Sequence, residues 1–155
     1  MSADRPVAYV AVVGPGEAGE EAILDGARAV GEELAQRGAV VVTGGLGGVM
    51  AAACRGAHDA GGSTLGILAG SDRAVANPWV TVAVATGLGE LRNGLVVRAA
   101  DAVIAVAGEY GTLSEIALAL KAGKRVVGLG TWQIRGVLVA PDPVAAVALA
   151  LVGRP

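Results

Sequence analysis

The residues best suited to chemistry lie in the segment 102–120, where an apolar strand leads through a glycine-bracketed turn into a helix. The strand covers residues 102–106, and the helix opens at Leu113. Such a junction aims several free backbone N–H groups at one point, where the helix dipole also favours negative charge. We therefore predict an anion site, above all for phosphate, formed by the turn residues Gly108, Glu109, Tyr110, Gly111 and Thr112.

A second glycine-rich loop follows the second predicted strand. Glycine occupies four of the five positions after that strand, at Gly44, Gly45, Gly47 and Gly48, and Met50 stands just beyond them. The missing Cβ atoms let a ligand approach the backbone closely, and a plain strand-to-helix turn requires fewer glycines. Tight packing of the helix on the strand is the alternative, and the same glycines can meet both needs. We favour a ligand-binding loop.

Two charged residues near these loops each have two interpretations. The Thr112-x-x-Glu115 spacing fits a capping box, in which Thr112 caps the helix and Glu115 reaches back to the N-cap amide. Glu115 could instead act as an acid, a base or a cation stabiliser beside a bound nucleotide, although the pattern alone favours the cap. Arg92 lies in the first turn of a predicted helix, where the dipole disfavours a cation unless an anion compensates it. A solvated pair with Glu90 is the alternative for Arg92.

Residues 14–19 have the G-x-G-x-x-G spacing of a dinucleotide-binding loop, but the rest of that site is missing. The second strand ends in threonine and glycine, not in the acidic residue that would hold the ribose. Glu17, Glu20 and Glu21 also place negative charge where the pyrophosphate would lie. We therefore expect neither NAD nor FAD.

The composition narrows the function classes further. The chain has 155 residues, a formal net charge of −2, two tryptophans, two tyrosines and no phenylalanine. It lacks the basic excess and the aromatic platforms of nucleic acid binding, so we expect no nucleic acid partner. A single cysteine and a single histidine exclude a soft-metal cluster, and we predict no metal ion and no resident cofactor. The glycine-interrupted apolar runs argue against a membrane span and the polar start against a signal peptide, so a cytoplasmic protein is expected.

Apolar runs and glycine-rich turns alternate along the chain in a strand–helix pattern. Near-continuous apolar strands separated by helices are typical of a parallel sheet covered on both faces. The predicted strands are residues 7–13, 39–43, 64–68, 80–85, 102–106, 125–129 and 137–140, and the predicted helices are residues 20–37, 49–60, 90–100, a segment from 113 onward, and 143–151. We predict a single α/β domain over residues 1–155, a Rossmann-like three-layer sandwich with a mostly parallel sheet and its ligand at the carboxyl ends of the strands.

Three of these motifs together resemble the Lonely-guy (LOG) superfamily, whose members were long labelled lysine decarboxylases. They are the loop 44–50 (Gly-Gly-Leu-Gly-Gly-Val-Met), the pair Arg92-Asn93, and residues 107–115 (Ala-Gly-Glu-Tyr-Gly-Thr-Leu-Ser-Glu). The chain is similar above all to a short branch of that superfamily that includes molybdenum-cofactor-carrier-like proteins, through Leu-Arg-Asn and the ending Gly-Leu-Gly-Thr-Trp.

This resemblance implies a pocket for a phosphorylated small molecule of nucleotide or pterin type. In this sequence it makes Arg92 and Glu115 the catalytic pair, and Gly108, Gly111 and Thr112 the phosphate cradle. The implied activity is that of a nucleoside 5′-monophosphate phosphoribohydrolase, which releases base and ribose 5-phosphate. A non-catalytic carrier or sensor of a molybdopterin-type cofactor or nucleotide is the alternative. The resemblance also implies a homodimer or a higher homo-oligomer.

Three positions depart from the pattern of the hydrolases in that superfamily. Asn93 stands in place of a lysine, Ala107 in place of a proline, and Glu109 in place of a glycine. An inward-pointing Glu109 carboxylate would lower phosphate affinity, whereas an outward-pointing one would leave the backbone cradle intact. We therefore predict ligand binding first of all, and catalysis only second.

Overall fold

The computed structural model describes residues 7–17 and 19–153. The strands are β1 (Tyr9–Val13), β2 (Val40–Thr43), β3 (Thr64–Leu68), β4 (Val82–Ala85), β5 (Ala102–Val106), β6 (Arg125–Leu129) and β7 (Val137–Val139). The helices are α1 (Glu21–Gln36), α2 (Val49–Asp59), α3 (Arg92–Ala99), α4 (Tyr110–Lys121) and α5 (Pro143–Ala150), with the short turns η1 (Arg73–Val75) and η2 (Gly89–Leu91). Strands and helices alternate as the sequence predicts.

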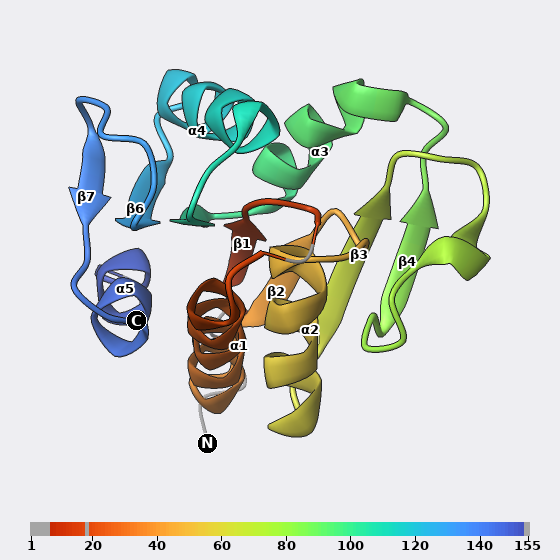
Figure 1. Cartoon of the computed structure of the whole chain (residues 1–155), viewed down its shortest axis with the longest axis horizontal. Helices are drawn as coiled ribbons and strands as arrows, with labels where there is room; N and C mark the ends of the chain where they lie inside the picture. Colours follow the sequence, from red (N-terminus) through yellow and green to blue (C-terminus); the bar gives the residue numbers. More distant parts are fainter. Residues whose placement is uncertain (1–6, 18, 154–155) are drawn as a thin grey trace.

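All seven strands of the described residues join one parallel sheet in the order β4-β3-β2-β1-β5-β6-β7. The first strand lies at the centre, where Val10 pairs with Val41 of β2 and Val12 pairs with Ile104 of β5. From β1 the chain builds outward to β4 and then returns to place β5 on the other side of β1 (Figure 1). The strand order therefore reverses between β1 and β5, which is where open α/β sheets bind ligands.

Side chains of each central strand alternate between two helical layers. Val10 and Val12 of β1 pack in one core with α1, α2 and α5, whereas Ala11 and Val13 pack in a second core with α3 and α4. Both sets are buried, as expected for strands that helices cover on both faces. The predicted Rossmann-like α/β sandwich is confirmed, and its sheet is parallel throughout the described residues (Figure 1).

Glycines inside two helices explain how closely the layer of α1 and α2 packs. A Cβ on Gly31 of α1 would overlap the Ala53 carbonyl of α2, and a Cβ on Gly56 of α2 would overlap the Arg28 carbonyl oxygen of α1. Glycine in a helix interior is unfavourable by about 1 kcal/mol relative to alanine, so the backbone contact between the helices is the compensating gain. This contact fixes the two helices that follow the β1 and β2 loops.

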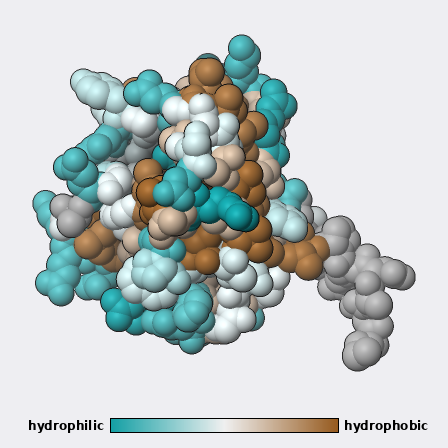
Figure 2. Space-filling view, turned by 90° about the vertical axis from the view of Figure 1, so that its right-hand side faces the viewer, coloured by the Kyte–Doolittle hydropathy of each residue, from teal (hydrophilic) through white to brown (hydrophobic). Residues whose placement is uncertain are grey.

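The side of the molecule that carries β4 keeps hydrophobic side chains at its surface. Figure 2 faces this side and shows hydrophobic areas interleaved with hydrophilic ones. The exposed hydrophobic side chains of the protein include Val82 and Val84 of β4, Leu88 and Leu91 of the segment before α3, and Leu95 of α3. Because β4 is an edge strand with β3 as its neighbour, this end of the sheet is less covered than its centre.

Candidate functional site

A pocket of about 230 Å³ lies at the carboxyl ends of the central strands, where the strand order reverses. Its walls come from the loops after β1, β2 and β5 and from the N-terminal halves of α2, α3 and α4. The residues that line it are Val12, Val13, Gly14, Pro15, Gly16, Gly44, Leu46, Met50, Arg92, Asn93, Glu109, Gly111, Thr112 and Glu115. Segments far apart in the sequence thus converge at the edge where the ligand is predicted.

The pocket brings together many of the predicted site residues: Gly44, Met50, Arg92, Glu109, Gly111, Thr112 and Glu115. The others, Gly45, Gly47, Gly48, Gly108 and Tyr110, lie outside its lining. Gly48 has a φ of 59°, and a Cβ there would overlap the Pro15 carbonyl oxygen. In the glycine-rich loop, Gly44 therefore faces the pocket, whereas Gly48 lets this loop pack against the loop after β1. The binding or catalytic roles of these residues stay predictions.

The loop after β1 contributes pocket residues that are not among the predicted site residues. Gly14, Pro15 and Gly16 line the pocket. A Cβ on Gly14 would lie 2.5 Å from the Val106 carbonyl oxygen and 2.7 Å from Val49 Cγ1, so glycine lets this loop approach the end of β5. The sequence does contain a signal for these residues. In a doubly wound sheet the first strand ends where the strand order reverses, and here a glycine-containing loop follows that strand.

Helix α4 begins at Tyr110 with Glu109 as its N-cap, earlier than the predicted start at Leu113. A capping box joins Glu109 and Thr112, in which the Glu109 N–H donates to Thr112 Oγ1 at 3.4 Å. The prediction that Thr112 is the N-cap and Glu115 its capping partner is therefore wrong. The two pairs have the same spacing, and the extended backbone of Glu109 decides which of them caps. Glu115 falls in the second turn of α4, where it has no capping role.

The Glu115 carboxyl lines the pocket from that second turn. Burial raises its pKa from 4.5 to about 7, and the positive charge of Arg92 opposes part of the rise. Within the described part of the chain, no hydrogen bond or close ion pair fixes this carboxyl. Near neutral pH the group therefore changes between a neutral hydrogen-bond donor and an anionic acceptor.

Arg92 is the first residue of α3, and its guanidinium is held by the pocket wall. Its Nη1 donates to the carbonyl oxygens of Gly44 at 2.6 Å and Ile67 at 2.9 Å, which joins α3 to the ends of β2 and β3. A Cβ on Gly44 would overlap Nη1, so the glycine is needed for this contact. Burial lowers the pKa of Arg92, and the charge of Glu115 raises it. In the described structure Arg92 forms no ion pair with Glu90.

Asn93, which stands where the hydrolases have a lysine, joins the two helices of the second layer. Its Oδ1 accepts from Arg92 Nε at 3.1 Å, and its Nδ2 donates to Ser114 Oγ at 3.3 Å. Ser114 Oγ in turn donates to the Gly111 carbonyl oxygen at 2.7 Å. Asn93 thus links α3 to the first turn of α4 and adds no positive charge to the pocket.

The departure at Ala107 has a backbone cause. Ala107 has a φ of 54°, the single positive φ among the described residues other than glycine. Its N–H donates to the Leu129 carbonyl oxygen at 3.0 Å. Proline has a φ near −65° and no N–H, so it could satisfy neither requirement. The turn after β5 therefore has a different conformation from one that holds proline at this position.

The N-terminus of α4 provides donors for an anion. The first N–H groups of a helix have no intrahelical acceptor, and Gly111 and Thr112 of the first turn line the pocket. Glu109 also lines the pocket, with an exposed side chain that belongs to the capping box. An arriving phosphate therefore meets the positive end of the helix dipole and, beside it, a carboxylate that partly offsets that attraction.

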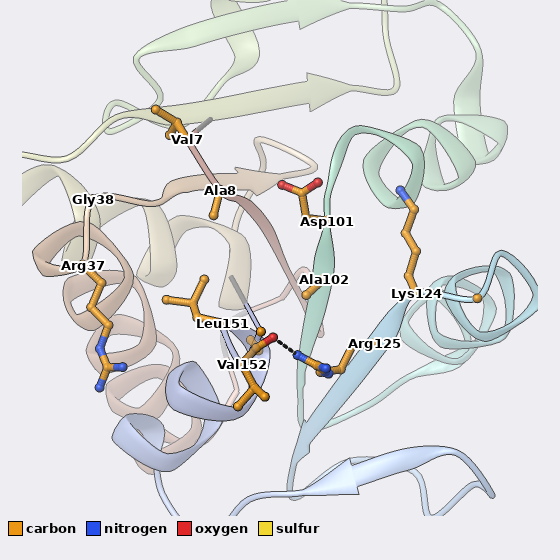
Figure 3. Close-up of a pocket in the computed structure, with 13 residues that line it drawn as sticks. Val7, Ala8, Arg37, Gly38, Asp101, Ala102, Lys124, Arg125, Leu151 and Val152 are labelled. Atoms are coloured by element: carbon orange, nitrogen blue, oxygen red, sulfur yellow. Dashed lines mark hydrogen bonds between the residues drawn. The ribbon is translucent and has the colours of Figure 1, made fainter. Parts of the chain in front are cut away.

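A larger cavity, of about 990 Å³, lies at the opposite edge of the sheet, where β1, β5 and β6 begin (Figure 3). Its three cations are already engaged, Arg37 with the Glu33 carboxylate and the other two with backbone carbonyls at helix ends. Lys124 Nζ donates to the Val97 carbonyl oxygen at 2.7 Å, and Arg125 Nη1 donates to the Val152 carbonyl oxygen at 2.6 Å. The Asp101 carboxylate accepts from the Tyr9 N–H at 2.8 Å. These charges stabilise the ends of α3 and α5 and the start of β1, which leaves the smaller pocket as the candidate site.

The described residues contain no helix that is both long and apolar enough to cross a bilayer. Among them, no three histidine, cysteine, aspartate or glutamate side chains gather in a way that could bind a metal ion. The lone cysteine, Cys54, is buried, and burial raises the pKa of its thiol. Its Sγ lies 3.4 Å from Thr43 Oγ1 beneath the β2 loop.

Residues 7–147 of the chain match the sequence model of the SLOG cluster4 family. It is 45% identical over 120 residues to an uncharacterized protein of Archaeoglobus fulgidus, covering 77% of this chain and 78% of that protein.

Two solved structures resemble this one in both fold and sequence. A molybdenum cofactor binding protein from the phototrophic bacterium Rippkaea orientalis has a TM-score of 0.87 and 36% identity, over 93% of this chain and 95% of that chain. The molybdenum cofactor carrier protein MCP from Chlamydomonas reinhardtii has a TM-score of 0.83 and 35% identity, over 92% of this chain and 95% of that chain. The predicted resemblance to the Lonely-guy superfamily is thereby confirmed, and the chain belongs to the SLOG cluster4 family.

Proposed function

We propose that this protein binds a phosphate-bearing planar cofactor of the molybdopterin type and carries it without changing it chemically. The observation that carries the proposal is the pocket at the N-terminus of α4, in a chain that is 36% identical to a molybdenum cofactor binding protein. The similarity to that protein and to a carrier protein spans more than nine-tenths of the chain. The ligand class therefore comes from relatives that share both sequence and fold with this chain, and not from the fold alone.

The residues present fit a phosphate group. Gly111 leaves space in the pocket, because a Cβ there would have as its nearest neighbour Asn93 Nδ2 at 4.0 Å. The N–H groups of the first turn of α4 would bind the phosphate oxygens, and the helix dipole adds to the attraction. Glu115, when protonated, would add a hydrogen-bond donor to the same space.

The fixed position of Arg92 favours carriage over hydrolysis. Its Nη1 already donates to two carbonyl oxygens, and its Nε donates to Asn93. A guanidinium so engaged shapes the wall of the pocket and offers fewer donors to a reacting group. The absence of the hydrolase lysine at Asn93 and the carboxylate of Glu109 further reduce the positive charge that would orient a phosphorylated substrate.

A direct test uses the molybdenum cofactor itself. The purified chain is mixed under anaerobic conditions with cofactor released from a molybdenum enzyme and is then separated by size exclusion. We expect molybdenum and pterin to elute with the protein. A Gly111→Leu variant, which fills the cradle, should lose both, whereas Ala117→Leu on the exposed face of α4 should retain them. Protein that elutes without molybdenum or pterin would contradict the proposal.

The second candidate function is hydrolysis of a nucleoside 5′-monophosphate to base and ribose 5-phosphate. The specific observation in its favour is Glu115, whose pKa of about 7 suits a general acid that protonates a leaving base. Incubation with a panel of nucleoside monophosphates tests it through the release of free base. Turnover that Glu115→Gln abolishes would establish the hydrolase. If the nucleotides stay intact, hydrolysis is contradicted and the carrier function remains as the proposal.

The predicted homodimer or higher homo-oligomer stays a prediction. The exposed side chains of Leu88, Leu91 and Leu95 give such an assembly an apolar surface beside α3. Sedimentation velocity of the purified chain measures its mass in solution. A monomer at micromolar concentration would show the prediction to be wrong.

A further inference from the structure

The volume of the pocket is too small for a whole phosphorylated heterocycle. Pockets that enclose drug-sized ligands have volumes of about 300–1,000 Å³, and this one has about 230 Å³. If the phosphate lies against α4, as the proposed function requires, the fused rings of a pterin or purine must extend past the rim. A surface that recognises a flat ring is therefore expected just outside the pocket.

Two of the four aromatic side chains of the protein stand together at this rim. Tyr110 and Trp132 have ring centroids 6.3 Å apart and planes inclined by 26°. Tyr110 is 83% exposed although it lies between the pocket-lining residues Glu109 and Gly111. Trp132 is not a core residue, because it is 38% exposed.

Trp132 is held in place against the turn that forms the pocket. Its Nε1 donates to the Glu109 carbonyl oxygen at 3.2 Å. Gly108 makes room for it, because a Cβ there would lie 2.7 Å from Trp132 Cδ1 and Nε1. The hydrogen bond fixes the indole ring before any ligand arrives, so the pair loses little conformational freedom on binding. Gly108 thus makes room for this tryptophan, and its predicted part in the phosphate cradle stays a prediction.

We propose that Tyr110, supported by Trp132, is the stacking surface for the planar nitrogen heterocycle of the ligand. This inference rests on the proposed function and extends it, because it assigns recognition of the ring to residues outside the pocket. An exposed tyrosine ring offers a π-face to pterin and purine alike, so the surface selects for a flat heterocycle and not for one particular base. The phosphate site and the ring site are then separate, and each can be tested alone.

The experiment compares two probes that differ in the ring. Guanosine 5′-monophosphate and ribose 5-phosphate share a phosphorylated ribose, and their affinities are measured by equilibrium dialysis while release of free base is monitored. We expect the wild-type protein to bind the nucleotide about tenfold more tightly, from stacking of one base. Tyr110→Ala should remove that difference and leave the affinity for ribose 5-phosphate unchanged. Tyr110→Phe should keep the wild-type preference.

Leu118→Ala is the matched control, since Leu118 is an exposed residue of the same helix away from the pocket, and it should bind both probes as the wild type does. Equal loss of both probes in Tyr110→Ala, or no loss of either, would overturn the stacking role. If the wild-type protein binds both probes equally, the stacking role is also overturned. This holds even if the molybdenum cofactor co-elutes with the protein and the carrier function stands. A wild-type protein that retains neither probe nor the molybdenum cofactor would overturn both proposals.

Discussion

The two edges of the sheet carry cavities of opposite character. The cavity at the amino edge has about 990 Å³ and the pocket at the carboxyl edge has about 230 Å³. At the amino edge, Lys124 and Arg125 donate to carbonyl oxygens at the ends of α3 and α5. At the carboxyl edge, the first N–H groups of α4 have no intrahelical acceptor, and Glu115 titrates near neutral pH. The smaller cavity is the better candidate because the Glu115 carboxyl and N–H groups at the start of α4 can still bind a ligand.

The largest effect is expected from Gly44→Ala at the carboxyl edge. The added Cβ would overlap Arg92 Nη1 and lie 2.7 Å from Met50 Sδ. Both neighbours are ends of flexible side chains that can move aside, so the cost comes from the displacement of Arg92, which leaves the Gly44 and Ile67 carbonyl oxygens without that donor. Hydrogen bonds to charged groups contribute about 1.5–3 kcal/mol. We expect a loss of about 3 kcal/mol in the free energy of unfolding, together with loss of ligand binding.

Urea denaturation and dialysis of Gly44→Ala measure the two losses. Gly70→Ala is the control, because a Cβ on Gly70 would have nothing within 4 Å and its φ is not positive. If Gly44→Ala is as stable as Gly70→Ala and binds ligand, then Arg92 does not hold the wall of the pocket.

Lys124→Met probes the amino edge in the same way. The variant removes an ammonium group that donates to the carbonyl oxygens of Val97, Arg98 and Ala100 at the end of α3. Hydrogen bonds to charged groups contribute about 1.5–3 kcal/mol, so we expect a loss of about 2 kcal/mol in the free energy of unfolding. Ligand affinity should stay unchanged. Weaker ligand binding in a folded Lys124→Met protein would contradict the assignment of ligand binding to the carboxyl edge and of helix stabilisation to the amino edge.

The elements and the edge that carries the pocket could be predicted because they depend on local signals. Apolar runs, glycine turns and the Asp142-Pro143 start of α5 are read within a few residues. The rule that ligands bind at the carboxyl ends of parallel strands then brings the loops of Gly44 and Gly111 to one edge without knowledge of side chains.

Contacts that depend on the folded backbone could not be predicted. The bond from Arg92 to the Ile67 carbonyl oxygen spans 25 residues, and no spacing rule indicates it. The start of α4 was missed because Glu109-x-x-Thr112 and Thr112-x-x-Glu115 are equally spaced, and the backbone dihedral angles choose between them. The position of Trp132 against Gly108 likewise depends on the adjacency of β5 and β6.

Glu115→Gln tests the raised pKa at the carboxyl edge. Because the folded-state pKa of about 7 lies above the ordinary value of 4.5, the folded protein binds more protons between these values, and its stability falls as pH rises through 7. Glutamine does not titrate, so the variant should match the wild type at pH 5 and be more stable at pH 8. After allowance for solvent access, we expect about 2 kcal/mol at pH 8.

Thermal unfolding at both pH values gives this comparison. If Glu115→Gln is destabilised equally at pH 5 and pH 8, the carboxylate is making a structural bond, as the rejected capping role would require. Asp25→Asn, on an exposed residue of α1, controls for the general effect of removing a negative charge.

The smallest effect is expected from Glu109→Gln, which changes the charge at the pocket and keeps the cap. Glutamine keeps a side-chain oxygen that can accept from the Thr112 N–H, so stability should change by less than about 0.5 kcal/mol. Removal of a carboxylate from the N-terminus of α4 should strengthen binding of inorganic phosphate by about two- to fivefold at low ionic strength, since an exposed charge contributes about 0.3–1 kcal/mol there. The gain should disappear in 1 M salt, where the screening length is about 3 Å. Because glutamine has nearly the size and shape of glutamate, the variant changes the charge alone, and unchanged phosphate affinity at low ionic strength would contradict this role of the Glu109 charge.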